Sequence, residues 1–311
     1  MSSDRNPAMP SITQTIQSLK QELNAVILAH TYQPAQVQDI ADYVGDSYGL
    51  SVEATKTPAD VIVFCGVMFM AETAAILNPK KRVIIPEPGA GCPMADMITA
   101  AELAELKKKL PDHLVICYVN STADIKALSD ICCTSSNAVK IVSQLPKEQG
   151  IIFVPDKHLG GWVQEKTGHA MVLWDGFCPT HVRISPDIVR AAKALHPNAP
   201  VLIHPEAPKA SRDLADEVLS TGGMCDFVKK GHAVEYIIAT ETGIIHTLQK
   251  RNPAKRFYPA TEHALCPNMK KTSLDLVVET LQGNAGQVVT VPADIADKAR
   301  KSLTRMLEMS R

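Results

Sequence analysis

The chain lacks the features that usually mark membrane, secreted or nucleic-acid-binding proteins. Its longest apolar run, Val61 to Met70, covers about half of a membrane span. A formal net charge of -1 gives no electrostatic basis for binding nucleic acid or an anionic membrane. Residues 1–10 are polar and contain proline, without the apolar core of a signal peptide, so we expect a disordered tail there and a cytoplasmic protein with reduced cysteines.

Two further absences limit the architecture. No long Gly/Ser linker marks a domain boundary, and the eight cysteines in 311 residues include no Cys-x-x-Cys pair. The second absence argues against the usual closed zinc site, which often takes its four ligands from two such pairs. At this length, and with 45% hydrophobic residues, the chain can bury substantial cores in two or three domains.

What the sequence does contain is a periodic Cys-Pro pair. Cys92, Cys178 and Cys266 are each followed by proline, and they are separated by 86 and 88 residues. Chance would supply fewer than one such pair in a chain of this composition, so the spacing indicates an internal repeat. Each repeat is predicted to deliver one thiolate to a shared point.

Other residues follow the same period. About 60 residues before each cysteine, an apolar run ends in two polar or aromatic residues spaced i, i+2, which therefore point to the same side of a strand end. A hydroxyl residue stands 43 to 45 residues before each cysteine. The pairs are His30/Tyr32, Tyr118/Asn120 and His204/Glu206, and the hydroxyl residues are Ser47, Ser135 and Thr221. Different side chains at matched positions predict a pseudo-threefold molecule with an asymmetric central site.

The fold class predicted is α/β, with three homologous parallel-sheet domains in a triangular arrangement. Expected strands are 25–29, 60–65, 82–85, 114–118, 150–154, 171–174, 201–204 and 235–239, and expected helices are 35–43, 47–56, 99–109, 186–196 and 273–281. This alternation is typical of parallel sheets covered by helices. The repeat places the domains at 11–97, 98–184 and 185–291, and 292–311 is predicted to be a docking helix that opens at Pro292.

The repeated residues are expected to face one cavity. Ligands of open parallel sheets bind beyond the carboxyl ends of the strands, where the i, i+2 pairs lie. The hydroxyl residues lie in turns that open helices, whose free N–H groups favour phosphate or carboxylate. Zinc held by the three cysteines and His181 is one interpretation. An iron-sulfur cluster on three thiolates is favoured, because it leaves one iron open as a Lewis acid in a cavity rich in acid-base groups.

Several motifs between residues 24 and 272 resemble quinolinate synthase. They include Ala29-His30-Thr31-Tyr32-Gln33, Gly45-Asp46-Ser47-Tyr48-Gly49-Leu50, Cys92-Pro93-Met94, Cys133-Thr134-Ser135-Ser136-Asn137, Gly176-Phe177-Cys178-Pro179-Thr180-His181, His204-Pro205-Glu206 and Cys266-Pro267-Asn268-Met269. The resemblance implies a triangular protein of three α/β domains around a 4Fe-4S cluster. It also implies the reaction: iminoaspartate condenses with dihydroxyacetone phosphate, losing phosphate and two waters, to give quinolinic acid for NAD biosynthesis.

The resemblance also assigns roles to residues. It implies Cys92, Cys178 and Cys266 as the three cluster ligands, with one iron open. The implied catalytic residues are His30, Tyr32, Tyr118, His181, His204 and Glu206, and the implied substrate-binding residues are His30, Ser47, Tyr118, Asn120, Ser135, His204, Glu206 and Thr221. The expected partners are the two small substrates and, in transient contact, an L-aspartate-oxidising enzyme; neither nucleic acid nor membrane is expected.

Two other functions remain alternatives at this point. One is a different 4Fe-4S hydro-lyase acting on a hydroxy acid, and the other is a non-catalytic iron-sulfur sensor, although we find no DNA-binding or interaction module. The cysteines outside the repeat are interpreted as small buried hydrophobic residues at Cys65, Cys117 and Cys225. Of the adjacent Cys132 and Cys133, at most one is expected to line the cavity.

Overall fold

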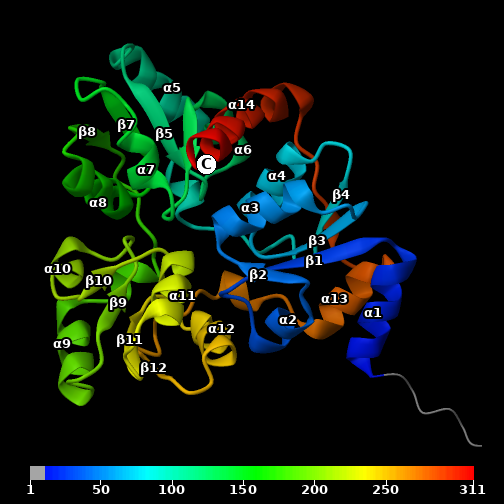
Figure 1. Cartoon of the computed structure of the whole chain (residues 1–311). Helices are drawn as coiled ribbons and strands as arrows, with labels where there is room; N and C mark the ends of the chain where they lie inside the picture. The colour runs from blue at the N-terminus through cyan, green and yellow to red at the C-terminus, as the bar shows by residue number, and fades with distance from the viewer. Residues whose placement is uncertain (1–10) are drawn as a thin grey trace, which may run out of the picture.

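The computed structural model describes residues 11–311 and contains three separate parallel sheets, each covered by helices (Figure 1). The three α/β units lie around a common centre, as the blue, green and yellow-green parts of the chain show in Figure 1. The predicted α/β class with three parallel-sheet units is therefore confirmed. The tail predicted at 1–10 lies outside the described residues.

The three sheets share one topology. The first contains β1 (Ala25–His30), β2 (Tyr43–Gly45), β3 (Val61–Cys65) and β4 (Arg82–Ile85); the second contains β5 (Leu114–Tyr118), β6 (Ile131–Cys133), β7 (Ile151–Val154) and β8 (Met171–Leu173); the third contains β9 (Val201–Ile203), β10 (Glu217–Val218), β11 (Glu235–Ala239) and β12 (Arg256–Pro259). In each sheet the parallel strands run in the order second, first, third, fourth. The repeat read from the cysteines is thus a repeat of topology.

Helices connect the strands of each unit. The first unit has α2 (Ala35–Ile40), α3 (Ser47–Lys56) and α4 (Met68–Leu77); the second has α5 (Ala100–Lys109), α6 (Ala123–Leu128), α7 (Ala138–Val142) and α8 (Lys157–Thr167); the third has α9 (Pro186–Leu195), α10 (Lys209–Arg212), α11 (Thr221–Lys230) and α12 (Ile244–Arg251). A short 3-10 helix follows each Cys-Pro pair, at η1 (Ala95–Met97), η2 (His181–Arg183) and η3 (Asn268–Lys270). The cysteines therefore occupy equivalent places in the three units.

Some boundaries differ from those expected. The helix predicted over 35–43 ends at Ile40, because the edge strand β2 begins at Tyr43. The apolar run from Val61 to Met70 is divided at Gly66 into the whole of strand β3 and the beginning of helix α4. The edge strands β2, β6 and β10 have only two or three residues each, too few for a pattern of alternation to predict them.

The last part of the chain returns to the other units. Helix α13 (Leu274–Gln282) packs against α1 (Ile12–Glu22), and β13 (Gln287–Val288) pairs antiparallel with β4. Helix α14 (Ala293–Met309) packs on α6, β6 and α4, and it buries Leu303 and Met306 completely. It thereby bridges the first and second units (Figure 1). The domain limits at 97, 184 and 291 stay a prediction.

Burial of the central strands fixes each unit. All five residues of β3 and all four of β7 are buried, as expected for strands covered by helices on both faces.

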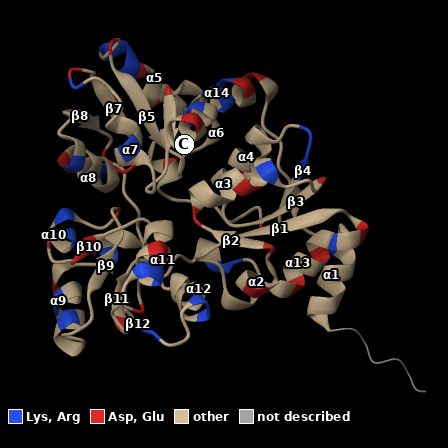
Figure 2. Cartoon of the chain, viewed as in Figure 1, with Lys and Arg blue, Asp and Glu red and all other residues tan. Residues whose placement is uncertain are grey.

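Lys, Arg, Asp and Glu are interspersed along the outer helices, and neither sign dominates the face shown in Figure 2. Over residues 11–311, the helices include none with the length and apolar character needed to cross a bilayer.

Candidate active site between the three units

The strand ends of the three units meet at one cavity of about 160 Å³. Every residue that the sequence analysis assigned to the site lines it. These thirteen residues are His30, Tyr32, Ser47, Cys92, Tyr118, Asn120, Ser135, Cys178, His181, His204, Glu206, Thr221 and Cys266. The fold thus brings together residues separated by as many as 236 positions because each unit turns the carboxyl ends of its strands toward the centre.

Three half-buried thiols lie in this cavity, one from the loop before each 3-10 helix. Burial raises the pKa of Cys92 to about 12 and also raises the pKa values of Cys178 and Cys266. The charge of Glu206, followed by that of Cys92, adds to the upward shift of the pKa of Cys178. A bound cationic metal centre reverses this preference for the thiol form.

The donor set fits the cluster that the resemblance implies. Cysteines outside the repeat are absent from the cavity wall formed by the described residues. Three thiols for a cluster of four irons leave one iron without a cysteine ligand. The cavity thus offers the incomplete ligand set that an open-iron cluster requires.

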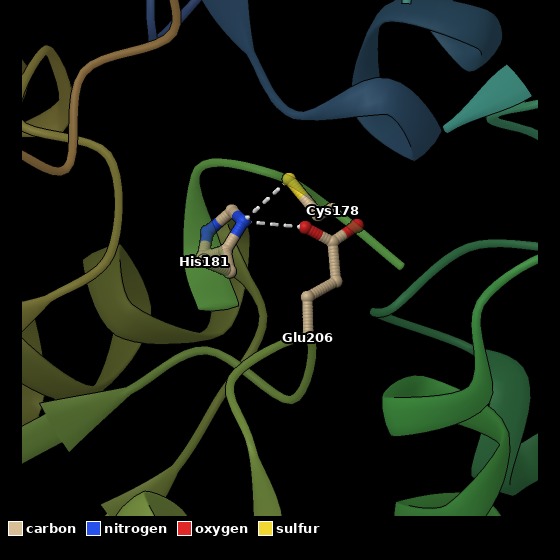
Figure 3. A group of neighbouring side chains, drawn as sticks. All are labelled: Cys178, His181 and Glu206. Atoms are coloured by element: carbon tan, nitrogen blue, oxygen red, sulfur yellow. Dashed lines mark hydrogen bonds and ion pairs between the residues drawn. The ribbon is translucent and has the colours of Figure 1, made fainter. Parts of the chain in front are cut away.

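His181 is held between Cys178 and Glu206 (Figure 3). Its Nδ1 lies 2.6 Å from Glu206 Oε2 and 3.1 Å from Cys178 Sγ, and the three donor atoms lie within 4.8 Å of one another. Its Nε2 lies 2.8 Å from Thr240 Oγ1. Both ring nitrogens therefore have protein partners, and these contacts fix the plane of the imidazole beside Cys178.

Glu206 and His204 form the acid-base part of the wall. Glu206 Oε2 lies 3.7 Å from His204 Nδ1, while His204 Nε2 lies 3.2 Å from Ser135 Oγ. Burial lowers the pKa of His204 to about 3. Burial alone raises the pKa of Glu206, but His181 and then His204 outweigh it and lower that pKa below its usual range. At neutral pH the site thus contains an ionised carboxylate beside a neutral imidazole.

Two phenols face this carboxylate. Tyr32 Oη lies 2.9 Å from Thr221 Oγ1 and 2.7 Å from Thr240 Oγ1. Burial raises the pKa values of Tyr32 and Tyr118, and the charge of Glu206 raises them further by a smaller amount. Both side chains therefore remain protonated at neutral pH and are available as proton donors.

The hydroxyl residues lie beside the edge strands. Ser47 is the first residue of α3 and Thr221 the first residue of α11, and the N-caps Asp46 and Ser220 accept from the amides of Gly49 and Gly223. Ser135 instead lies three residues before Ala138, the start of α7. The helix-start interpretation therefore applies to two of the three positions.

Sequence reasoning missed two site residues that follow β11. Thr240 is 1% exposed and contacts both Tyr32 and His181, and the adjacent Glu241 is fully buried against the loop of Cys266. The available signal was the position of two polar residues directly after the predicted strand 235–239. The i, i+2 pairs were identified by a related signal, in which the two polar or aromatic residues at the end of an apolar run are two positions apart.

The cysteines outside the repeat lie away from the cavity wall. Cys65, Cys117, Cys132 and Cys133 are fully buried, and Cys225 is a partly buried residue of α11. Neither Cys132 nor Cys133 is among the lining residues. The adjacent cysteines thus belong to the core of the second unit.

Comparison with known proteins identifies the family of this chain. The family model described as Quinolinate synthetase A protein matches residues 14–308. Quinolinate synthase from Dehalococcoides mccartyi strain CBDB1 is 51% identical over 298 residues, 96% of this chain and 98% of the relative. The enzymes from Geobacter metallireducens and Caldicellulosiruptor bescii are 51% and 50% identical, covering 97% and 94% of this chain and 98% and 97% of the relatives. The chain belongs to the quinolinate synthase family.

Proposed function

We propose that the central cavity condenses iminoaspartate with dihydroxyacetone phosphate to give quinolinate, phosphate and two waters. The products contain all atoms of the two substrates, so the reaction needs no external oxidant. Three anionic groups enter the site: two carboxylates and one phosphate. The cavity accommodates such charge through hydroxyl groups and through two helix starts whose N–H groups favour anions.

Cys92, Cys178 and Cys266 are proposed to hold the 4Fe-4S cluster of the family. The support is that each unit delivers one thiol to the same cavity. When bound, the cluster supplies a Lewis acid at its open iron. His181 is assigned to the substrate side, because Glu206 and Thr240 engage its two ring nitrogens.

Different side chains around this site are assigned to the different proton transfers of the reaction. Glu206 is the proposed general base, since it is a buried carboxylate whose Oε1 has no hydrogen-bond partner among residues 11–311. Tyr32 and Tyr118 are proposed proton donors, and His30 and His204 are neutral imidazoles that accept or relay a proton.

Substrate binding is assigned to the remaining matched positions. Ser47, Ser135 and Thr221 are proposed to donate hydrogen bonds to the anionic groups. Asn120 is also assigned to substrate binding, because its buried Oδ1 has no protein partner in the part of the chain that the structure describes and can accept a hydrogen bond from an N–H or O–H group of a substrate. A cytoplasmic location and a transient contact with an L-aspartate-oxidising enzyme complete the proposal.

The observation that carries the proposal is the convergence of the matched residues, and an anaerobic assay tests it. Protein purified without oxygen should contain iron and labile sulfide and form quinolinate only when both substrates are present. Cys92→Ala, Cys178→Ala and Cys266→Ala should lose the cluster and the activity, whereas Cys65→Ala should retain near-normal iron, because Cys65 is buried away from the cavity.

Two results would overturn the assignment. Stoichiometric zinc without labile sulfide would favour the zinc interpretation. Cluster loss in His181→Ala as complete as in Cys178→Ala would make His181 a ligand.

A further inference from the structure

A buried carboxylate holds the backbone beside the third cysteine. Glu241 is 0% exposed. Its Oε1 accepts a hydrogen bond from the Cys266 amide at 3.1 Å and lies 2.8 Å from Lys270 Nζ. Its Oε2 accepts from the Gly243 amide at 2.7 Å. One side chain thus connects the end of β11 to the loop that carries Cys266.

Lys270 extends this connection to another unit. Its Nζ also donates to the main-chain oxygen of Tyr32, at the end of the first sheet. A Cβ at Gly243 would lie 2.7 Å from Lys270 Nζ, 2.8 Å from Glu241 Oε2 and 2.9 Å from Tyr32 Cα. Because Gly243 has no Cβ, it leaves room for the ion pair between Glu241 and Lys270 to lie against Tyr32 of the first unit.

The pair needs both charges. A carboxylate without exposure is costly unless an opposite charge and hydrogen bonds compensate it, and Lys270 is the cation that does so here. Removing Lys270 leaves Glu241 uncompensated and releases the loop from Tyr32. Removing the charge of Glu241 leaves Lys270 unpaired and weakens the contact with the Cys266 amide.

We propose that Glu241 and Lys270 are positioning residues that set the third cluster ligand, Cys266, against Tyr32 across the boundary between the third and first units. This inference rests on the ligand set proposed above. Groups around a ligand that orient it typically change metal affinity by about 10- to 100-fold when removed. The pair is expected to control how firmly the cluster is retained, in addition to how the cavity wall is aligned.

Iron release from the anaerobically purified holoenzyme to a ferrous chelator tests the pair. Lys270→Met should release iron about 10- to 100-fold faster than wild type, Glu241→Gln should also be faster, and Lys270→Arg should recover most of the loss. Lys250→Met is the matched control, because Lys250 makes an ion pair with Asp39 at 2.6 Å across the same two units but on the surface. That variant should release iron at the wild-type rate.

The spectrum of the reduced cluster gives a second readout. It should shift in Lys270→Met and return toward wild type in Lys270→Arg, a recovery that general damage to the fold would not produce. Far-UV circular dichroism checks each variant, and if Glu241→Gln does not fold, Lys270→Met decides.

Wild-type release rates in Lys270→Met would overturn the inference, and so would an equal loss in Lys270→Met and Lys270→Arg. Failure of the ligand assignment is distinguishable, because Cys266→Ala would then keep its full iron content.

Discussion

Replacing Glu206 by glutamine separates proton transfer from substrate binding. Glutamine has nearly the same volume as glutamate, and the side chain is 2% exposed, so the amide should occupy the same space between His181 and His204. The variant loses the negative charge and the basicity, while a carbonyl oxygen remains to accept a hydrogen bond. We therefore expect the cluster, the fold and substrate affinity to be retained.

The expected loss of rate in Glu206→Gln follows from the proposed role of Glu206 as a general base. Removing a general acid-base group costs about 100- to 10,000-fold in rate, which corresponds to about 3 to 5 kcal/mol in the activation free energy. Because the pKa of Glu206 is lowered, wild type keeps the carboxylate ionised throughout the neutral range, and the loss in Glu206→Gln should be the same at pH 6 and pH 8. KM should change by no more than a few-fold, since the lost interaction acts mainly in the transition state.

The assay is steady-state quinolinate formation with iron measured in every preparation. Glu72→Gln is the control, because Glu72 is a largely buried glutamate of α4 that does not line the cavity. Turnover of Glu206→Gln within a few-fold of wild type, at full iron content, would refute the assignment of the base to this carboxylate.

Three further predictions concern binding, pH and packing. Thr221→Val should weaken substrate or product affinity by about one to two orders of magnitude in a titration, because a lost hydrogen bond to a charged group costs about 1.5–3 kcal/mol. Burial lowers the pKa values of His30 and His204 to about 3, below the unfolded value of about 6.5. The contribution of each histidine to the free energy of unfolding is therefore fully present above pH 6.5. It falls by up to about 1.4 kcal/mol per pH unit as the pH falls from 6.5 toward 3. Urea unfolding of the apo-protein at pH 7, 6 and 5 should therefore show a smaller decline in His30→Gln than in wild type. Leu303→Ala should lower the free energy of unfolding by about 2–5 kcal/mol, because Leu303 of α14 is fully buried against the other elements, and chemical denaturation measures this loss.

Much of the architecture could be predicted from the sequence because it depends on local patterns. Apolar runs such as 114–118 predicted strands that the structure contains with the same bounds, and the helix predicted over 47–56 is also present without change. The Cys-Pro period indicated three equivalent units, which the common strand order confirms. Because strand ends in parallel sheets share one edge, the sequence alone assigned the matched polar residues to one cavity.

The contacts between units could not be predicted in this way. Tyr32 meets Thr221 and Thr240 across 189 and 208 residues, and Lys270 meets the Tyr32 main chain across 238. No local period specifies which side chains of two different units touch, and the return of β13 to the first sheet has no counterpart in the repeat.

The sequence by itself therefore determined the repeated unit and the residue types at its strand ends. Tertiary packing alone decided their protonation and partners, because burial and neighbouring charges arise only when the three units close around the cavity. Glu206 has a lowered pKa because His181 and His204 adjoin it, and Glu241 is tolerated without exposure because Lys270 lies beside it.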